Sequence, residues 1–121
     1  MLACLSVALG GAVGSVARYL VGLIKLNESV VFPFKTLAIN VIGSFLIGII
    51  AALAAKKGGL SPNLVLFLKV GVCGGFTTFS TFALETADLM RSGKTLIAFL
   101  YIVLSVLLSV SAVFLAEWLA K

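Results

Sequence analysis

Histidine is absent from this sequence, and residues that could carry out chemistry are scarce in general. The 121 residues include no His and only four acidic side chains, so few groups could serve as general acids, general bases or metal ligands. The two cysteines, Cys4 and Cys73, lie inside apolar runs, and we interpret them as small packing residues. Because no nucleophile, base or metal site is assembled, we expect that the protein is not an enzyme.

Charge of either sign is also scarce. Only 11% of the residues are charged and 62% are hydrophobic, whereas a soluble domain carries about 25% charged residues. Such a chain could not cover a surface that faces water, so we expect the lipid bilayer to surround it. The nine basic residues are scattered singly and form no stripe with exposed aromatic residues, which argues against a nucleic acid partner. The first nine residues carry no basic segment, so we expect a retained span there instead of a cleaved signal peptide.

Four segments are long and apolar enough to span a membrane, a length of about 20 residues each. They run over residues 2–24, 33–55, 62–89 and 95–120, within one domain of residues 1–121. The links between them are short, so neighbouring helices should be antiparallel. The sequence therefore predicts an all-α integral membrane protein with four transmembrane helices, a multi-pass protein of the cell membrane.

Basic residues are nearly balanced between the two sides of this predicted bundle. One side holds Lys56, Lys57, Lys69 and Lys121, and the other holds Arg18, Lys25, Lys35, Arg91 and Lys94. Because the side that is richer in Lys and Arg sets the orientation, so even a distribution favours insertion in both directions. Two opposite copies would supply the symmetry that larger transporters obtain from inverted repeats. A single topology, set by partners or lipids, is the alternative.

Polar side chains inside the spans need a reason, because they are costly in lipid. In the second span, Asn40 lies on a face of small residues, where it is either a bond between helices or part of a pore lining. In the fourth span, Tyr101, Ser105 and Ser109 recur every four residues, which places three hydroxyls on one face over about 12 Å. Three hydroxyls in an otherwise apolar helix favour a polar track over ordinary bonding to the backbone.

The third span contains the most informative segment, residues 71–82. Gly74-Gly75 falls at mid-membrane, where we expect the helix to break; unwound backbone there is tolerated only when it is buried or lines a cavity. The next residues alternate aromatic rings with hydroxyls: Phe76, Thr77, Thr78, Phe79, Ser80, Thr81 and Phe82. Hydroxyls can replace the water around an anion, and the edges of aromatic rings carry positive partial charge. The pattern suits a small, hard anion that must also leave, although core packing of the rings is the simpler alternative.

These segments resemble the Fluc (CrcB) family of fluoride channels over essentially the whole chain. The matching motifs are Gly11-x-x-Gly14-x-x-x-Arg18-Tyr19, Thr36-Leu37-x-x-Asn40-x-x-Gly43-x-x-x-x-Gly48 and Gly71-x-x-Gly74-Gly75-x-Thr77-Thr78-Phe79-Ser80-Thr81-Phe82. The resemblance implies a fluoride-selective channel of the prokaryotic plasma membrane. It would export fluoride passively from the cytoplasm through two pores of an antiparallel, dual-topology homodimer.

The resemblance also implies roles for individual residues. Phe79 and Phe82 would coordinate fluoride by their ring edges. The other expected pore residues are Asn40, Tyr101, Ser105 and Ser109, a polar track of Ser80, Thr81 and Glu85, and Arg18 in the vestibule. Backbone carbonyls of Gly74 and Thr77 from both subunits would bind one structural sodium ion at the centre of the dimer.

Two other functions fit four short spans. A small multidrug transporter, also of dual topology, would need a carboxylate inside the membrane, but Glu85, Asp88 and Glu117 lie near span ends. A purely structural assembly subunit would have no use for the hydroxyl tracks.

Overall fold

The computed structural model describes all residues, 1–121, and it consists of helices joined by short links. Three spans are continuous helices: α1 (Leu2–Gly22), α2 (Phe34–Ala55) and α6 (Thr95–Leu119). The remaining span, Pro62–Arg91, is divided into α3 (Pro62–Val65), the π-helix η1 (Leu66–Cys73), α4 (Gly74–Phe76) and α5 (Phe79–Arg91). All four spans are long and apolar enough to cross a membrane, which confirms the predicted all-α class.

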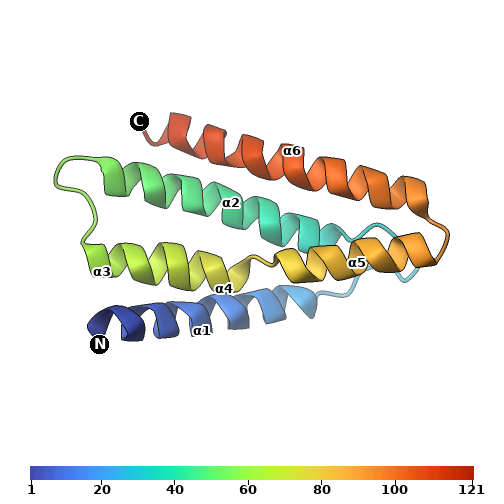
Figure 1. Cartoon of the computed structure of the whole chain (residues 1–121), viewed down its shortest axis with the longest axis horizontal. Helices are drawn as coiled ribbons and strands as arrows, with labels where there is room; N and C mark the ends of the chain where they lie inside the picture. Colours follow the sequence, from blue (N-terminus) through green and yellow to red (C-terminus); the bar gives the residue numbers. More distant parts are fainter.

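The spans lie roughly parallel to one long axis, and the connecting links lie at the two ends of the bundle (Figure 1). The N-terminus, the link between α2 and α3 and the C-terminus lie at one end, and the other two links lie at the opposite end. Helix α2 packs mainly against α6, while α1 packs against η1 and α4. The second and third spans therefore form the middle of the bundle, with α1 and α6 on the outside.

Glycines let α1 approach the third span backbone to backbone. A Cβ atom added to Gly10 would fall on the carbonyl of Phe67, and one added to Gly14 would fall on the carbonyl of Val72. From the other side, a Cβ on Gly75 would come within 2.6 Å of the carbonyl oxygen of Gly11. In lipid, close packing of this kind replaces the hydrophobic effect as the force that holds helices together.

The third span is interrupted, as the sequence predicts, but the predicted position at Gly74-Gly75 was wrong. Gly74 has helical dihedral angles (φ −64°, ψ −38°), and the chain becomes extended only at Thr77 (ψ 155°) and Thr78 (φ −150°, ψ 114°). Gly75 lets α1 approach closely because it has no Cβ atom, and the absence of a side chain serves this contact equally well in a regular helix. The break falls where side chains replace the lost backbone hydrogen bonds.

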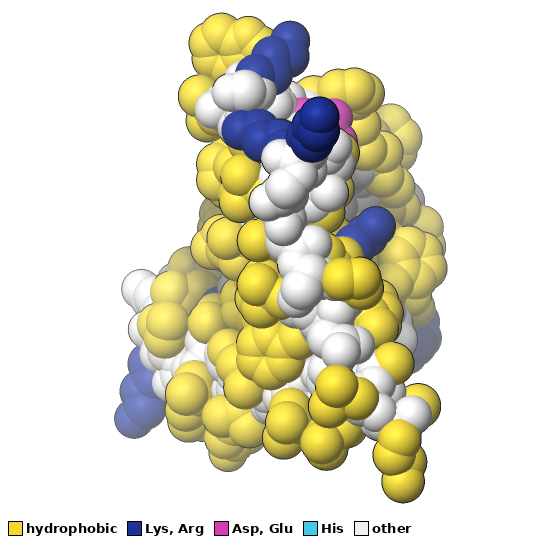
Figure 2. All heavy atoms as spheres, turned by 90° about the vertical axis from the view of Figure 1, so that its left-hand side faces the viewer, with side chains coloured by type: hydrophobic (Ala, Val, Ile, Leu, Met, Phe, Trp, Pro, Cys, Tyr) yellow, Lys and Arg dark blue, Asp and Glu magenta, His cyan; other side chains and the backbone are white.

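Most large apolar side chains of the chain are exposed. Only 16 of the 121 residues are buried, so the apolar surface of this single subunit is available to lipid or to another protein. Figure 2 shows the end that carries both termini, where Lys and Arg side chains protrude among hydrophobic ones. The composition and this surface make the protein a multi-pass membrane protein.

Candidate functional site

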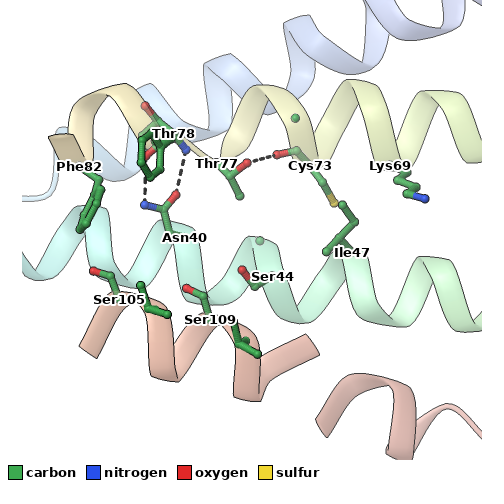
Figure 3. A pocket seen from close by; sticks show the side chains of 15 residues that line it. Asn40, Ser44, Ile47, Lys69, Cys73, Thr77, Thr78, Phe82, Ser105 and Ser109 are labelled. Carbon is green, nitrogen blue, oxygen red and sulfur yellow. Dashed lines mark hydrogen bonds between the residues drawn. The ribbon is translucent and has the colours of Figure 1, made fainter. Parts of the chain in front are cut away.

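The main site is a cavity of about 400 Å³ between α2, α6 and the broken third span, which we call the central groove. It brings together five residues that the sequence assigns to a pore, namely Asn40, Phe79, Phe82, Ser105 and Ser109. Its other polar lining comes from Ser44, Lys69, Cys73, Gly74, Thr77 and Thr78. Figure 3 shows these side chains facing one another from three different spans.

Asn40 holds the broken backbone in place. Its Oδ1 accepts a hydrogen bond from the Thr78 backbone N–H at 2.8 Å, and its Nδ2 donates to the Thr78 carbonyl at 3.1 Å (Figure 3). The amide therefore supplies both partners that Thr78 would have found in a continuous helix. The bond between helices is therefore present, and the same side chain also lines the groove; its place in a pore stays a prediction.

Hydroxyl groups continue from this break into α5. The Thr78 hydroxyl accepts from the backbone N–H of Thr81 at 3.2 Å and so caps the N-terminus of the helix. It also donates to the Thr81 hydroxyl at 3.0 Å and lies 3.4 Å from the hydroxyl of Ser80. A helix start built in this way presents a cluster of three hydroxyls beside the end of the groove.

The two predicted aromatic residues differ in their surroundings. Phe82 is partly buried and stacks in a tilted arrangement on Tyr101, with ring centroids 5.0 Å apart. Phe79 is 78% exposed and touches Phe82, with ring centroids 5.4 Å apart. Both rings line the groove. Phe79 lacks the covering that a large apolar ring in a finished core would have.

Tyr101 and Glu85 form a hydrogen-bonded pair behind the groove. Tyr101 is completely buried, does not line the groove, and its hydroxyl donates to Glu85 Oε1 at 2.8 Å. Glu85 Oε2 accepts from the hydroxyl of Thr36 at 3.0 Å. Neither carboxylate oxygen meets a cation, since the only ion pair of the structure joins Arg91 and Asp88. Glu85 thus orients two hydroxyls and connects α2, α5 and α6.

Ser105 is the one buried side chain whose polar atom has no partner. It is 8% exposed, and its Oγ makes no hydrogen bond within the chain. A buried hydroxyl without a partner is costly in lipid, and Ser105 is among the residues that line the groove. Ser109, one turn further along α6, also lines the groove.

A second cavity of about 560 Å³ lies on the other side of the break, between α1, α2 and α5. Arg18 and Lys35 line it together with Thr78, Thr81 and Glu85. The Arg18 Nε donates to the Gly75 carbonyl at 3.1 Å, which satisfies a backbone group that the break leaves without a helical partner. Thr78 lines both cavities, so the hydroxyl cluster separates the groove from a compartment with two basic residues.

The break also leaves oxygen atoms that could hold a cation. No hydrogen bond of the structure ends on the carbonyl oxygen of Gly74 or Thr77, and both residues line the groove. No group of His, Cys, Asp or Glu side chains could hold a metal ion. The two free backbone carbonyls are therefore among the neutral oxygen atoms that this site offers to a cation.

The sequence alone indicated no site role for Thr36 or Lys69, although each lines a cavity in the structure. Thr36 and Ser44 lie four residues before and after Asn40, so the same face of α2 carries all three. That spacing was the signal that could have found Thr36. No spacing rule reveals that Asn40 bonds Thr78, because these residues are 38 positions apart.

A comparison with protein families covers the whole region that forms the groove. Residues 5–117 match the family described as CrcB-like protein, Camphor Resistance (CrcB). The chain belongs to the CrcB family. It is 50% identical to the "Fluoride-specific ion channel FluC" of Chlorobaculum tepidum, over 97% of this chain and 93% of that protein. It is 49% identical to the protein of that name from Hyphomonas neptunium, over 97% and 94% of the two chains.

A third relative of the same printed name shows similar identity. The fluoride-specific ion channel FluC of Rhizobium meliloti is 51% identical, over 91% of this chain and 89% of its own length. The matches cover all four spans, including the groove, the break and the hydroxyl cluster.

Proposed function

We propose that this CrcB protein is a fluoride-selective channel that lets fluoride leave the cytoplasm passively. The observation that carries the proposal is the groove itself, which is lined by two aromatic rings, the amide of Asn40 and the serines Ser105 and Ser109. The names of its relatives supply the identity of the ion. As a channel of this kind it performs no chemistry on its substrate and is not an enzyme.

The groove lining suits a strongly hydrated anion. Hydroxyl hydrogens of Ser105 and Ser109 can replace part of its water shell, and the second hydrogen of the Asn40 amide is free to do the same. Phe79 and Phe82 add ring edges with positive partial charge. Each of these contacts is weak on its own, so an ion can be bound and then released, as conduction requires.

The functional unit in this proposal is an antiparallel, dual-topology homodimer with two pores. Three features support it. The basic residues are balanced between the two ends, Phe79 is exposed to an unusual degree, and Gly74 is exposed at the break. A second, inverted copy would cover Phe79 and close the open side of the groove, and two copies would contain two grooves.

We include in this proposal one structural sodium ion between the two subunits. The unpartnered carbonyls of Gly74 and Thr77 fit such an ion, because two copies would offer four backbone oxygens and no net charge. A bound cation would neutralise the exposed carbonyl dipoles and hold the two breaks together.

Multidrug transport has no support in the groove. None of the residues that line it is Asp or Glu, and Glu85 is already engaged by Tyr101 and Thr36. Exchange of protons for cationic drugs would need a carboxylate that faces the substrate.

Fluoride efflux from liposomes, followed with a fluoride electrode, tests the proposal. Wild-type protein should release trapped fluoride, whereas Phe79→Ile and Phe82→Ile should lose most of the flux, because they keep the apolar volume but remove the ring edges. Phe82→Tyr, which keeps the ring, should do less harm. Phe114→Ile is the matched control, because Phe114 is an exposed ring on α6 that lies outside the groove.

If both rings only pack, Phe→Ile would lower stability in detergent while flux per folded protein stayed normal. Normal flux from a stable Phe79→Ile, Phe82→Ile double variant would refute the assignment of the pore. Absence of fluoride flux from folded wild-type protein would refute the function itself.

A further inference from the structure

Lys69 is a lysine inside a membrane span that the proposed pathway does not yet explain. It lies in η1, four residues before Cys73 and eight before Thr77, and all three line the central groove. Figure 3 shows it on the side of its helix that faces α2, beyond Cys73 and Ile47. A charged side chain within a span is costly, and by default it marks an ion pathway.

The ammonium group of Lys69 has no partner in the structure. The single ion pair joins Arg91 and Asp88, and no hydrogen bond involves the Lys69 side chain. Lys35 behaves differently, since its Nζ donates to the carbonyls of Gly22 and Ile24 at 3.0 and 2.9 Å. The charge of Lys69 is therefore available to a species inside the groove.

Anchoring to lipid headgroups is the alternative role of such a lysine. The span Pro62–Arg91 has 30 residues, so its length of about 45 Å exceeds the hydrocarbon thickness of about 30 Å and its first turns lie among the headgroups. The flexible stem of Lys69 can therefore hold the ammonium near the membrane surface, at the end of the groove nearest the chain termini. Anchoring does not exclude a second role, because Lys69 also lines the groove together with Ser44 and Ser109, so its charge acts on an ion that enters there.

We infer that Lys69 is an electrostatic determinant of conduction, a fixed positive charge that draws fluoride into the end of the groove nearest the two chain termini. This inference rests on the proposed fluoride channel. The cavity beyond the break already has Arg18 and Lys35, whereas Lys69 is the only charged residue that lines the groove. Each end of the hydroxyl cluster is then supplied with anions by its own basic residues.

The expected size of the effect follows from Coulomb's law. A unit charge about 6 Å from an anion in water raises the local anion concentration about threefold, and more where the surroundings are less polar. Salt screens this attraction, because the Debye length falls from about 30 Å at 0.01 M to about 3 Å at 1 M. A change of charge at Lys69 should therefore matter at low ionic strength and lose its effect at high ionic strength.

The test compares initial rates of fluoride efflux from liposomes at low fluoride, in about 0.01 M and about 1 M of an impermeant salt. Lys69→Gln should be slower than wild type by about threefold or more at low salt and equal to it at high salt. Lys69→Arg should behave as wild type, and Lys69→Glu should be slower than Lys69→Gln. Lys69→Met gives a second neutral variant that is favourable in lipid, should the glutamine variant fold poorly.

Lys57→Gln is the matched control, because it removes the same charge at the same end of the molecule but lies outside the groove. It should leave the rates unchanged. If wild-type protein conducts and both neutral Lys69 variants match it at both salt concentrations, Lys69 is only an anchor and the inference is overturned. An equal loss at both concentrations would indicate a structural role and also overturn it. Folded wild-type protein that releases no fluoride would instead refute the channel function.

Discussion

Removing the side chain of Asn40 should damage the channel through the break in the third span. In Asn40→Ala, the Thr78 N–H and the Thr78 carbonyl lose bonds of 2.8 and 3.1 Å, and no other side chain is bonded to either group. Both groups are partly buried and Thr78 lines both cavities, so water in the cavities can replace only part of what the amide supplies. The extended residues at the break would then lose the contact with α2 that fixes them.

The magnitude follows from these two bonds. Hydrogen bonds between membrane helices contribute on average about 0.6 kcal/mol and at most about 1.7 kcal/mol. A buried backbone group left without a partner costs about 1–3 kcal/mol. We therefore expect Asn40→Ala to lower the free energy of unfolding by about 1–3 kcal/mol. Asn40→Asp should fall between wild type and alanine, because the carboxylate still accepts from Thr78 but cannot donate to its carbonyl.

The measurement is a titration with SDS in mixed micelles, followed by fluoride efflux on the same preparations. Ser44→Ala is the control, because Ser44 lines the groove one turn along α2 and makes no side-chain hydrogen bond. It should keep the wild-type midpoint. An Asn40→Ala protein with both the midpoint and the flux of wild type would show that the break does not depend on this amide.

Ser105→Ala should keep or slightly raise stability, because it removes an unpartnered buried hydroxyl, but it should reduce fluoride flux. Glu85→Ala should cost about 1–3 kcal/mol in the SDS titration, because the hydroxyls of Tyr101 and Thr36 both lose their acceptor; wild-type stability would contradict the bonding described. Gly14→Leu should prevent correct packing of α1 on the third span, whereas Gly11→Ala, whose Cβ meets only open space, should yield normal amounts of folded protein. Reporters fused to the C-terminus should report from both sides of the membrane, and three added lysines in the link after Ala55 should shift them to one side; a single orientation in wild-type protein would exclude the antiparallel dimer.

The break at Thr77–Thr78 separates what could be predicted from what could not. Sequence reasoning placed it at the two glycines, because glycine is the residue that most easily leaves a helix. The structure keeps Gly75 helical because α1 packs against it, and it breaks the span where Asn40, from a different helix, can satisfy Thr78. The conformational preference of a residue is local. The free energy of a helix break in lipid depends instead on which neighbouring groups form hydrogen bonds with the freed backbone N–H and C=O.

Composition and spacing were sufficient for the membrane environment, the four spans and the hydroxyl face of α6. Each of these depends on residues that are neighbours in the chain, through the length of apolar runs and the helical repeat. Only the tertiary structure decided that Tyr101 turns to Glu85 and away from the groove, and that Ser105 has no partner. It also decided that the charge of Lys69 faces the groove unpaired. These properties arise from contacts between helices, which the spacing of residues along one helix does not specify. Whether a hydroxyl or ammonium group is paired or free depends on which groups of the neighbouring helices lie beside it.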